Sequence, residues 1–500
     1  MLAQKLILEY STQISIQLIR IAASIVVARI AGPTVLGTVA FGLAYVSMFI
    51  FISDLGLGTA HIKLVSEGKD LGKCISTYTV LRSVTTSFFF ILVLGIFLFQ
   101  KYVFYADFES TTHEYVIFIM LFAVTIQQFL TIPKTTFAAR TEQVKKDIPD
   151  FARNFTYQVL RIIIVLLGFR AIALAIGNLV STLLIIPVIF YLFKDYPHSG
   201  FDKSLAKRYL KISLPIILIG MSTSVISYLD KILLQFFTNS EQVGYYTAGY
   251  RIGGFVLLIA NSVSMLFFPL FSKAVANKDF EYIKNKINKF ERFSFLFIMP
   301  AVILLAIYSD TIVKLVLGPQ YIPSINIMLI ITVAMFLMVL NIPYGNVITG
   351  MGFFRLAAII NFLNFGFFVF VLVLLTYPKL LNLEATGAAI TVLLSNLFIG
   401  ILYRVFAKKK CQILRMKKGL MFFSYGILNF FVFNYLYHSL NILGDIKIKI
   451  LFVFVYLVIT YFSFYLLRWI KKEDWATLFE IVDIKSMSKY IKGEIRNNTL

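Results

Sequence analysis

The stretch LILEYSTQISIQLIRIAASIVVARI, residues 6–30, decides the class of fold. A run of this length and apolarity is sufficient to cross a bilayer as one α-helix, which needs about 20 residues. It is longer than the core of a cleavable signal, carries Arg20 in its middle and has no clear small-residue cleavage site, so we expect a retained spanning helix. Similar apolar runs follow as far as Arg468 with no polar domain between them.

The composition agrees with a membrane protein. The 500 residues are 59% hydrophobic, 16% aromatic and only 14% charged, and the mean hydropathy is +0.84. Such a chain cannot form a water-soluble globule with an ordinary charged surface, which excludes most enzymes. The formal net charge of +22 would indicate nucleic acid in a soluble chain. In a membrane chain it indicates topology instead, and we expect no nucleic-acid partner.

Neither a disulfide framework nor a metal cluster is expected. The two cysteines, Cys74 and Cys411, fall in segments that the predicted topology places in the cytoplasm, and the four histidines are scattered. The sequence GPTVLGT at 32–38 has the glycine spacing of a phosphate-binding loop, but Thr38 stands where the lysine must be. We therefore expect no bound cofactor, and only H⁺ or Na⁺ as a coupling ion.

Counting about 20 residues per crossing predicts an all-α integral membrane protein with about fourteen transmembrane helices. The predicted spans are 6–30, 36–58, 79–100, 115–133, 150–169, 171–193, 210–236, 248–271, 293–317, 325–349, 356–376, 386–406, 420–438 and 446–468.

Basic residues are distributed unevenly between the two sets of connecting loops. Most of the 47 lysines and arginines lie at the termini and in the loops after even-numbered spans. The loops after odd-numbered spans, together with the span ends that border them, hold only Lys101, Arg170, Lys314, Lys379, Lys447 and Lys449. The positive-inside rule therefore predicts that both termini are cytoplasmic, and an even number of spans agrees with termini on one side.

An internal repeat organises the chain. LGTVAFG at 36–42 aligns with VGYYTAG at 243–249, an offset of 207 that also pairs the first span with the seventh. LTIP at 130–133 matches LNIP at 340–343 after a small gap. Copies six spans apart share one orientation, which is the parallel arrangement of some transporters and favours a cavity between two lobes.

The repeat predicts four parts of the chain. They are an N-lobe at 1–200 (spans one to six), a C-lobe at 201–410 (spans seven to twelve), two appended helices at 411–470, and a cytoplasmic tail at 471–500.

Polar residues follow one face of the first span. Their spacings of 4, 3 and 4 place them on a single helical stripe, and the 207 offset carries the same stripe to Lys231 in the seventh span. Unpaired amides and a guanidinium are costly against lipid, so the stripe should face a hydrated cavity; helix–helix hydrogen bonds are the alternative. The stripe comprises Gln13, Gln17, Arg20 and Ser24.

Other charges inside the spans are candidates for the same cavity. Arg161 and Arg251 would add to a basic cavity, although Arg251 lies near a span end, whereas Arg29 and Arg82 are expected to be interfacial anchors. The in-membrane acids Asp54 and Asp230 would serve either as ion-coupling sites or as salt-bridge partners.

Proline and asparagine in the tenth span predict a broken helix that would suit a gate. Broken helices are common in moving transporters, but kinks also occur in static bundles. The residues expected to interrupt this span are Asn341, Pro343, Gly345 and Asn346.

Three further stretches carry a family resemblance. ARIAGPTVLG at 28–37, DLGLGTA at 54–60 and LDKILLQFFTNSEQVGYYTAGYR at 229–251 resemble the polysaccharide flippases of the multidrug/oligosaccharidyl-lipid/polysaccharide exporter superfamily, over essentially the whole chain. The glycine-rich patterns indicate the polysaccharide branch but not one sugar.

The resemblance implies a function and a location. Members of that branch flip polyprenyl-diphosphate-linked oligosaccharides across the bacterial inner membrane for O-antigen or capsule synthesis, by alternating access. Independently, a basic cavity suits an anionic diphosphate headgroup, and we expect Arg20 to be its first contact. We also expect a polysaccharide polymerase and a chain-length regulator as partners. A peptidoglycan-precursor flippase and a cation-coupled drug exporter are alternatives. A membrane glycosyltransferase or glycan polymerase is disfavoured by the small outward loops and sparse in-membrane carboxylates, and a membrane scaffold would not need Arg20.

Overall fold

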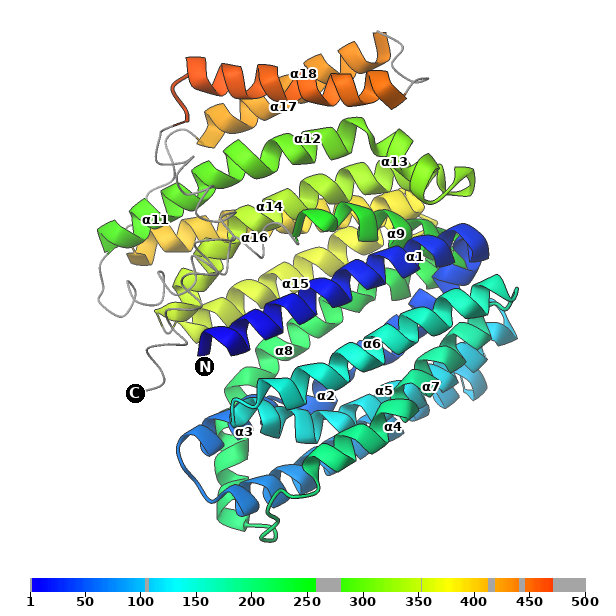
Figure 1. Cartoon of the computed structure of the whole chain (residues 1–500), viewed down its shortest axis with the longest axis vertical. Coiled ribbons are helices and arrows are strands. Elements are labelled where there is room, and N and C mark those ends of the chain that lie inside the picture. Colours follow the sequence, from blue (N-terminus) through cyan, green and yellow to red (C-terminus); the bar gives the residue numbers. More distant parts are fainter. Residues whose placement is uncertain are drawn as a thin grey trace. The chain divides into compact units, whose positions relative to one another are not determined.

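The computed structural model describes residues 2–103, 108–257, 280–351, 353–411, 419–439 and 446–470. Within these ranges every regular element is helical (Figure 1). The chain divides into two compact units, of which the first comprises Met1–Thr247 with Thr376–Lys379, and the second comprises Ala248–Leu375 and Leu380–Tyr490.

The first unit is a bundle in which α1 packs along α6, while α5 packs on α7 and α4. Its helices are α1 (Leu2–Ser47), α2 (Ile50–Asp54), α3 (Leu57–Ser66), α4 (Leu71–Tyr102), α5 (Thr111–Ala139), α6 (Gln143–Leu166), α7 (Ala171–Phe193), α8 (Lys203–Phe237) and the first half of α9 (Ser240–Gly253).

The predicted boundary between the first two spans is a kink within α1. Gly32 has φ 81° and ψ 172°, a backbone conformation that lacks a steric penalty only in glycine. Pro33 follows, and its fixed φ suits the first position of the helix that resumes there.

The second predicted span, 36–58, is wrong as a single helix. It is broken after Ser47 and again between α2 and α3, where Leu55 (φ 46°) and Gly56 (φ 78°) are left-handed. The Asp54 carboxylate accepts hydrogen bonds from the backbone N–H of Gly56 (3.2 Å) and Gly58 (3.3 Å), which stabilises the start of α3.

A reciprocal close contact joins the two sequences that the repeat aligns. A Cβ placed on Gly37 would lie 1.7 Å from the carbonyl oxygen of Ser240, and a Cβ placed on Gly244 would lie 2.0 Å from that of Pro33. An offset of 207 relates Pro33 to Ser240 and Gly37 to Gly244. The resumed part of α1 and the start of α9 therefore touch through equivalent positions, and only glycine permits this approach.

We expect Gly37→Ala to lower the free energy of unfolding by about 1–3 kcal/mol, because the new methyl group requires the two backbones to separate. The matched control is Gly95→Ala in α4, where an added Cβ would meet no atom within 4 Å. That control should stabilise the helix by at most about 1 kcal/mol. Unfolding titrations in mixed micelles measure both variants, and equal stabilities would contradict the close contact.

In the second unit α14 runs beside α16, and α12 packs on α14, α17 and α18 (Figure 1). Besides the rest of α9, its helices are α11 (Phe280–Phe293), the π-helical η1 (Ser294–Ile298), α12 (Met299–Ile307), α13 (Ser309–Val316), the 3₁₀ turn η2 (Pro319–Tyr321), α14 (Ser324–Gly350), α15 (Phe354–Thr376), α16 (Glu384–Cys411), α17 (Gly419–Ser439) and α18 (Ile446–Leu466).

The predicted interruption of the tenth span is wrong, because α14 is helical from Ser324 to Gly350 with Pro343 inside it. Proline removes one main-chain hydrogen bond and crowds a carbonyl of the preceding turn. Arg404 of α16 supplies a donor from outside the helix, since its Nη2 lies 3.1 Å from the Leu340 carbonyl oxygen. Leu340 is the residue after Val339, whose carbonyl loses its helical partner at Pro343, so the Arg404 bond reaches the turn that precedes the proline but does not replace the missing bond.

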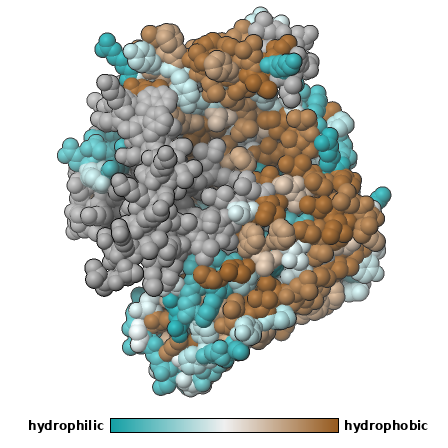
Figure 2. Space-filling model, in the orientation of Figure 1, coloured by the Kyte–Doolittle hydropathy of each residue, from teal (hydrophilic) through white to brown (hydrophobic). Residues whose placement is uncertain are grey.

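Nine helices in the described part of the chain are long and apolar enough to span a membrane. Large apolar side chains lie exposed along them, including Phe190 (66% exposed), Phe362 (67%) and Phe370 (66%). Figure 2 shows apolar residues over much of the visible described surface, with hydrophilic residues mainly toward its edges. The protein is an all-α membrane protein whose solvent over this surface is lipid. The four-part division predicted from the repeat, and the count of fourteen spans, stay predictions.

Candidate functional site

The polar stripe of α1 lies along the helix that α1 packs against, α6. Arg20 is exposed, and its Nη2 donates to Asn154 Oδ1 of α6 at 3.3 Å. Gln17 is half-buried and Ser24 is buried. The side chain of Gln13 lies outside the described part of the structure.

Helix α6 brings two more arginines to this place. Arg161 is buried at 6% exposure, its Nη1 donates to Gln158 Oε1 at 2.7 Å, and its guanidinium lies 5.5 Å from the ring centre of Tyr157. Arg153 is half-buried, and the charges of Arg153 and Arg161 both act on Arg20. We call Arg20, Arg153 and Arg161 the arginine cluster.

The sequence analysis predicted Arg20 and Arg161 as site residues but missed Arg153. Arg153 lies at the edge of a predicted span and is easily counted as a basic loop residue. Its spacing to Tyr157 and Arg161, four residues each time, places all three on one helical face and was the signal available. Three guanidiniums together present many N–H donors and three positive charges, so this place is suited to a multivalent anion.

Lys231 does not stand as an isolated cation. Its Nζ lies 3.0 Å from Oδ1 of Asp230, whose side chain is buried, and the Tyr246 hydroxyl donates to Asp230 Oδ2 at 2.6 Å. The pair is close to neutral. Arg251 is exposed in the last turn of α9, in the part of that helix that belongs to the second unit.

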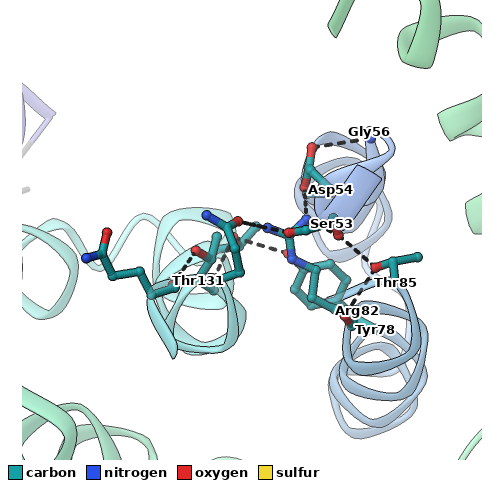
Figure 3. Close-up of polar contacts among 11 residues, drawn as sticks. Ser53, Asp54, Gly56, Tyr78, Arg82, Thr85 and Thr131 are labelled. Carbon is teal, nitrogen blue, oxygen red and sulfur yellow. Dashed lines mark hydrogen bonds and ion pairs between the residues drawn. The ribbon is translucent and has the colours of Figure 1, made fainter. Parts of the chain in front are cut away.

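Asp54 pairs with Arg82, as Figure 3 shows. Arg82 Nη1 lies 2.5 Å from Asp54 Oδ1 and 2.7 Å from the Ser53 carbonyl oxygen, and Nη2 donates to Gln128 Oε1 at 2.9 Å. Arg82 is 1% exposed, whereas the Asp54 side chain is 40% exposed. The expectation that Arg82 is an interfacial anchor is wrong, because it points from α4 toward the end of α2 and toward α5.

The second unit holds a polar network that the sequence analysis did not predict. Arg404 Nη1 donates to Asn341 Oδ1 at 2.7 Å, Nη2 lies 3.4 Å from Glu291 Oε1, and the Tyr344 hydroxyl donates to the same oxygen at 2.9 Å. Arg404 also lies over the Tyr344 ring, 4.5 Å from its centre. We call Arg404, Glu291, Asn341 and Tyr344 the Arg404 network. Asn346 is half-buried, and its carbonyl accepts from Thr349 at 3.2 Å.

Among the described residues no group of three or more His, Cys, Asp or Glu side chains is arranged to hold a metal ion.

The structure brings together some of the predicted site residues and separates others. Arg20 and Arg161 belong to the arginine cluster, and Lys231 pairs with Asp230. Asp54 and Asn341 each join a network whose arginine the predicted site did not include.

A family model described as polysaccharide biosynthesis protein matches residues 26–326. No curated protein sequence matches the chain.

Solved structures of transporters share its fold. A lipid II flippase, MurJ, in an inward closed conformation has a TM-score of 0.69 at 16% identity, covering 92% of this chain and 99% of its own. An inward-facing multidrug resistance transporter of the MATE family in the MOP superfamily has a TM-score of 0.63 at 15% identity, covering 79% and 94%. A MOP superfamily transporter from Pyrococcus furiosus, described as having a binding pocket of reversed polarity, has a TM-score of 0.55 at 16% identity, covering 82% and 94%. At these identities the likeness shows the fold alone.

Proposed function

Because the chain belongs to the polysaccharide biosynthesis protein family, we propose that it flips polyprenyl-diphosphate-linked oligosaccharide repeat units across the bacterial cytoplasmic membrane, for surface polysaccharides such as O-antigen or capsule. In this proposal both termini are cytoplasmic, the two lobes alternate access, and the protein is a transporter and not an enzyme.

The observation that carries the proposal is the arginine cluster. Arg20 of α1 and Arg161 of α6 lie on two helices that pack together, within range of electrostatic interaction, and Arg153 adds a third positive charge. A diphosphate presents several anionic oxygens to such donors, and an environment of low dielectric strengthens each charge-assisted hydrogen bond. Gln17, Gln158 and Tyr157 lie beside the arginines with amide and aromatic groups that suit a sugar.

The same cluster ranks the alternatives. A cation-coupled drug exporter would favour acidic side chains where its cationic substrates bind, and the cluster has the opposite charge. A peptidoglycan-precursor flippase also handles a lipid-linked diphosphate, so the arginines do not separate it from an oligosaccharide flippase. The two substrates differ in the headgroup attached to the diphosphate.

Translocation in vesicles tests the proposal. The purified protein is reconstituted with a polyprenyl-diphosphate oligosaccharide, and accessibility of the sugar to an enzyme added outside is followed with and without protein. We expect a protein-dependent rise. Parallel vesicles carry the peptidoglycan precursor, and a rise with that lipid alone would favour the alternative flippase. No rise with either lipid, under both H⁺ and Na⁺ gradients, would contradict lipid-linked glycan flipping.

We also propose that a gradient of H⁺ or Na⁺ supplies the energy for transport. Asp54 and Asp230 are acids in the spans with close basic partners, and binding of H⁺ or Na⁺ to either would alter its pairing. Dependence of the vesicle rate on one of the two gradients identifies the ion. We further propose that a polysaccharide polymerase and a chain-length regulator receive the product outside.

A further inference from the structure

The second unit contains a pocket of about 570 Å³ that the proposed transport site does not use. It lies between α11 with η1, α14, α16 and α17, and its lining includes every member of the Arg404 network. The rest of the lining is mainly apolar and includes Phe295, Leu337, Leu397 and Phe423.

The pocket has a polar end and an apolar end. Arg404 and Lys408 line it near the C-terminal end of α16, while Leu397 lines it about two turns before Arg404 and three before Lys408. At 1.5 Å per residue, Leu397 and Lys408 are separated by about 16 Å along the helix axis. Glu291 and Tyr344 join the polar end through Arg404, whereas Phe295 lies one turn beyond Glu291.

The polar end carries one uncompensated positive charge. The Arg404 guanidinium is balanced by Glu291, and it also donates to Asn341 and to the carbonyl oxygens of Leu340 and Gly400. Lys408 is exposed and, within the described part of the chain, has no carboxylate within ion-pair distance. A ligand group of single negative charge would complement it.

One wall of the pocket is open to the surroundings of the protein. Leu397, Ile401 and Val405 are spaced by four residues on α16, line the pocket, and are 42%, 60% and 45% exposed. An exposed apolar ridge on a membrane helix is suited to hydrocarbon, from which a lipid chain would reach the apolar end without passing through water.

We propose that this pocket binds one anionic phospholipid, with its phosphate at Lys408 and one acyl chain along the ridge of α16 toward Leu397 and Phe295. Basic pockets between transmembrane helices on the cytoplasmic side select anionic headgroups, and the predicted topology places the end of α16 on that side. The apolar end supplies affinity for the chain, and Lys408 supplies selectivity for charge. The ligand is a resident of the membrane and is distinct from the transported molecule.

Native mass spectrometry of the intact protein in detergent tests this proposal. The protein is incubated separately with phosphatidylglycerol, with phosphatidylcholine and with undecaprenyl phosphate, and the retained lipid is counted. We expect one tightly retained phosphatidylglycerol and weaker retention of phosphatidylcholine. Lys408→Gln should weaken retention of phosphatidylglycerol about fivefold, which corresponds to about 1 kcal/mol for one lysine near a membrane surface.

Two further variants separate charge from shape. Lys409→Gln removes the neighbouring lysine, which does not line the pocket, and should leave retention unchanged. Leu397→Trp fills the apolar end and should lower retention of both phospholipids. Equal retention of the two phospholipids by the parent protein, or an unchanged affinity in Lys408→Gln, would overturn the proposal. Preferential retention of undecaprenyl phosphate, lost in Leu397→Trp, would also overturn it and would assign the pocket to a substrate tail.

This inference is independent of the proposed function apart from the shared topology. Lys408→Gln should leave the vesicle translocation rate unchanged in a lipid mixture without anionic phospholipid. A failed translocation assay with retained phosphatidylglycerol therefore contradicts only the function, and the converse result contradicts only the lipid site.

Discussion

Arg20→Ala is expected to reduce protein-dependent translocation of the lipid-linked oligosaccharide by about ten- to a hundredfold. A hydrogen bond to a charged group contributes about 1.5–3 kcal/mol, and each 1.4 kcal/mol is a factor of ten. Arg20 is exposed in the cluster and has a single described protein acceptor, Asn154 at 3.3 Å, so most of its hydrogen-bonding capacity is available to a ligand. Its removal should therefore affect transport more than folding.

Companion variants make the result specific. Arg20→Lys keeps the charge but loses the planar fork, and should retain an intermediate rate. Arg29→Ala removes an exposed arginine from the same helix and should transport like the parent. The double variant Arg20→Ala/Arg153→Ala should lose less than the product of the single effects, because the two residues share one ligand in this proposal. Full transport by Arg20→Ala in correctly inserted protein would contradict the role of the arginine cluster.

The second large effect concerns the stability of the ion pair between Asp54 and Arg82, where removing the acid should cost more than removing the arginine. Asp54→Asn should lower the free energy of unfolding by about 3 kcal/mol or more, because Arg82 is 1% exposed and would keep a buried charge without a counter-charge. Arg82→Met should cost less. In that variant the remaining carboxylate of Asp54 is 40% exposed and still accepts from the N–H groups of Gly56 and Gly58.

Denaturation in mixed micelles at neutral pH compares the two variants. The double variant Asp54→Asn/Arg82→Met supplies the coupling free energy and should be more stable than Asp54→Asn alone. If Arg82→Met lowers the free energy of unfolding more than Asp54→Asn does, the prediction is contradicted, because an unpaired charge on buried Arg82 would then not be the main cost.

Hydropathy and helical spacing predicted much of this protein. Apolar runs gave the helical class and most helix positions, since the bilayer demands a span of fixed minimum length. The 4, 3, 4 spacing on α1 identified the stripe that meets α6, and charge alone singled out Arg161. Both signals depend on residues that are near one another in the sequence, so one sequence is enough to detect them.

Partners across helices were not predictable in this way. Arg404 was not singled out because it lies at the end of the predicted span 386–406, where basic residues begin, yet α16 continues to Cys411 and Arg404 bonds to α14. The break predicted at Pro343 was wrong because α14 continues through the proline, and proline and asparagine by themselves do not show whether a helix ends or continues. Arg82 was misjudged because its depth depends on Asp54, Ser53 and Gln128 from two other helices.

The reciprocal approach of Gly37 and Gly244 bears on the ancestry of the chain. In an ancestor with half the present length, two copies of one protein would have met through the same glycine, each offering it to the other, as in an isologous homodimer. Gene fusion would then have made that dimer interface internal. After fusion most positions are free to diverge. At Gly37 and Gly244, however, each residue lies against the backbone of the other copy, so a larger side chain at either position would clash. If the predicted repeat arose in this way, the two glycines are a record of the symmetric dimer, kept by the close approach of the two backbones.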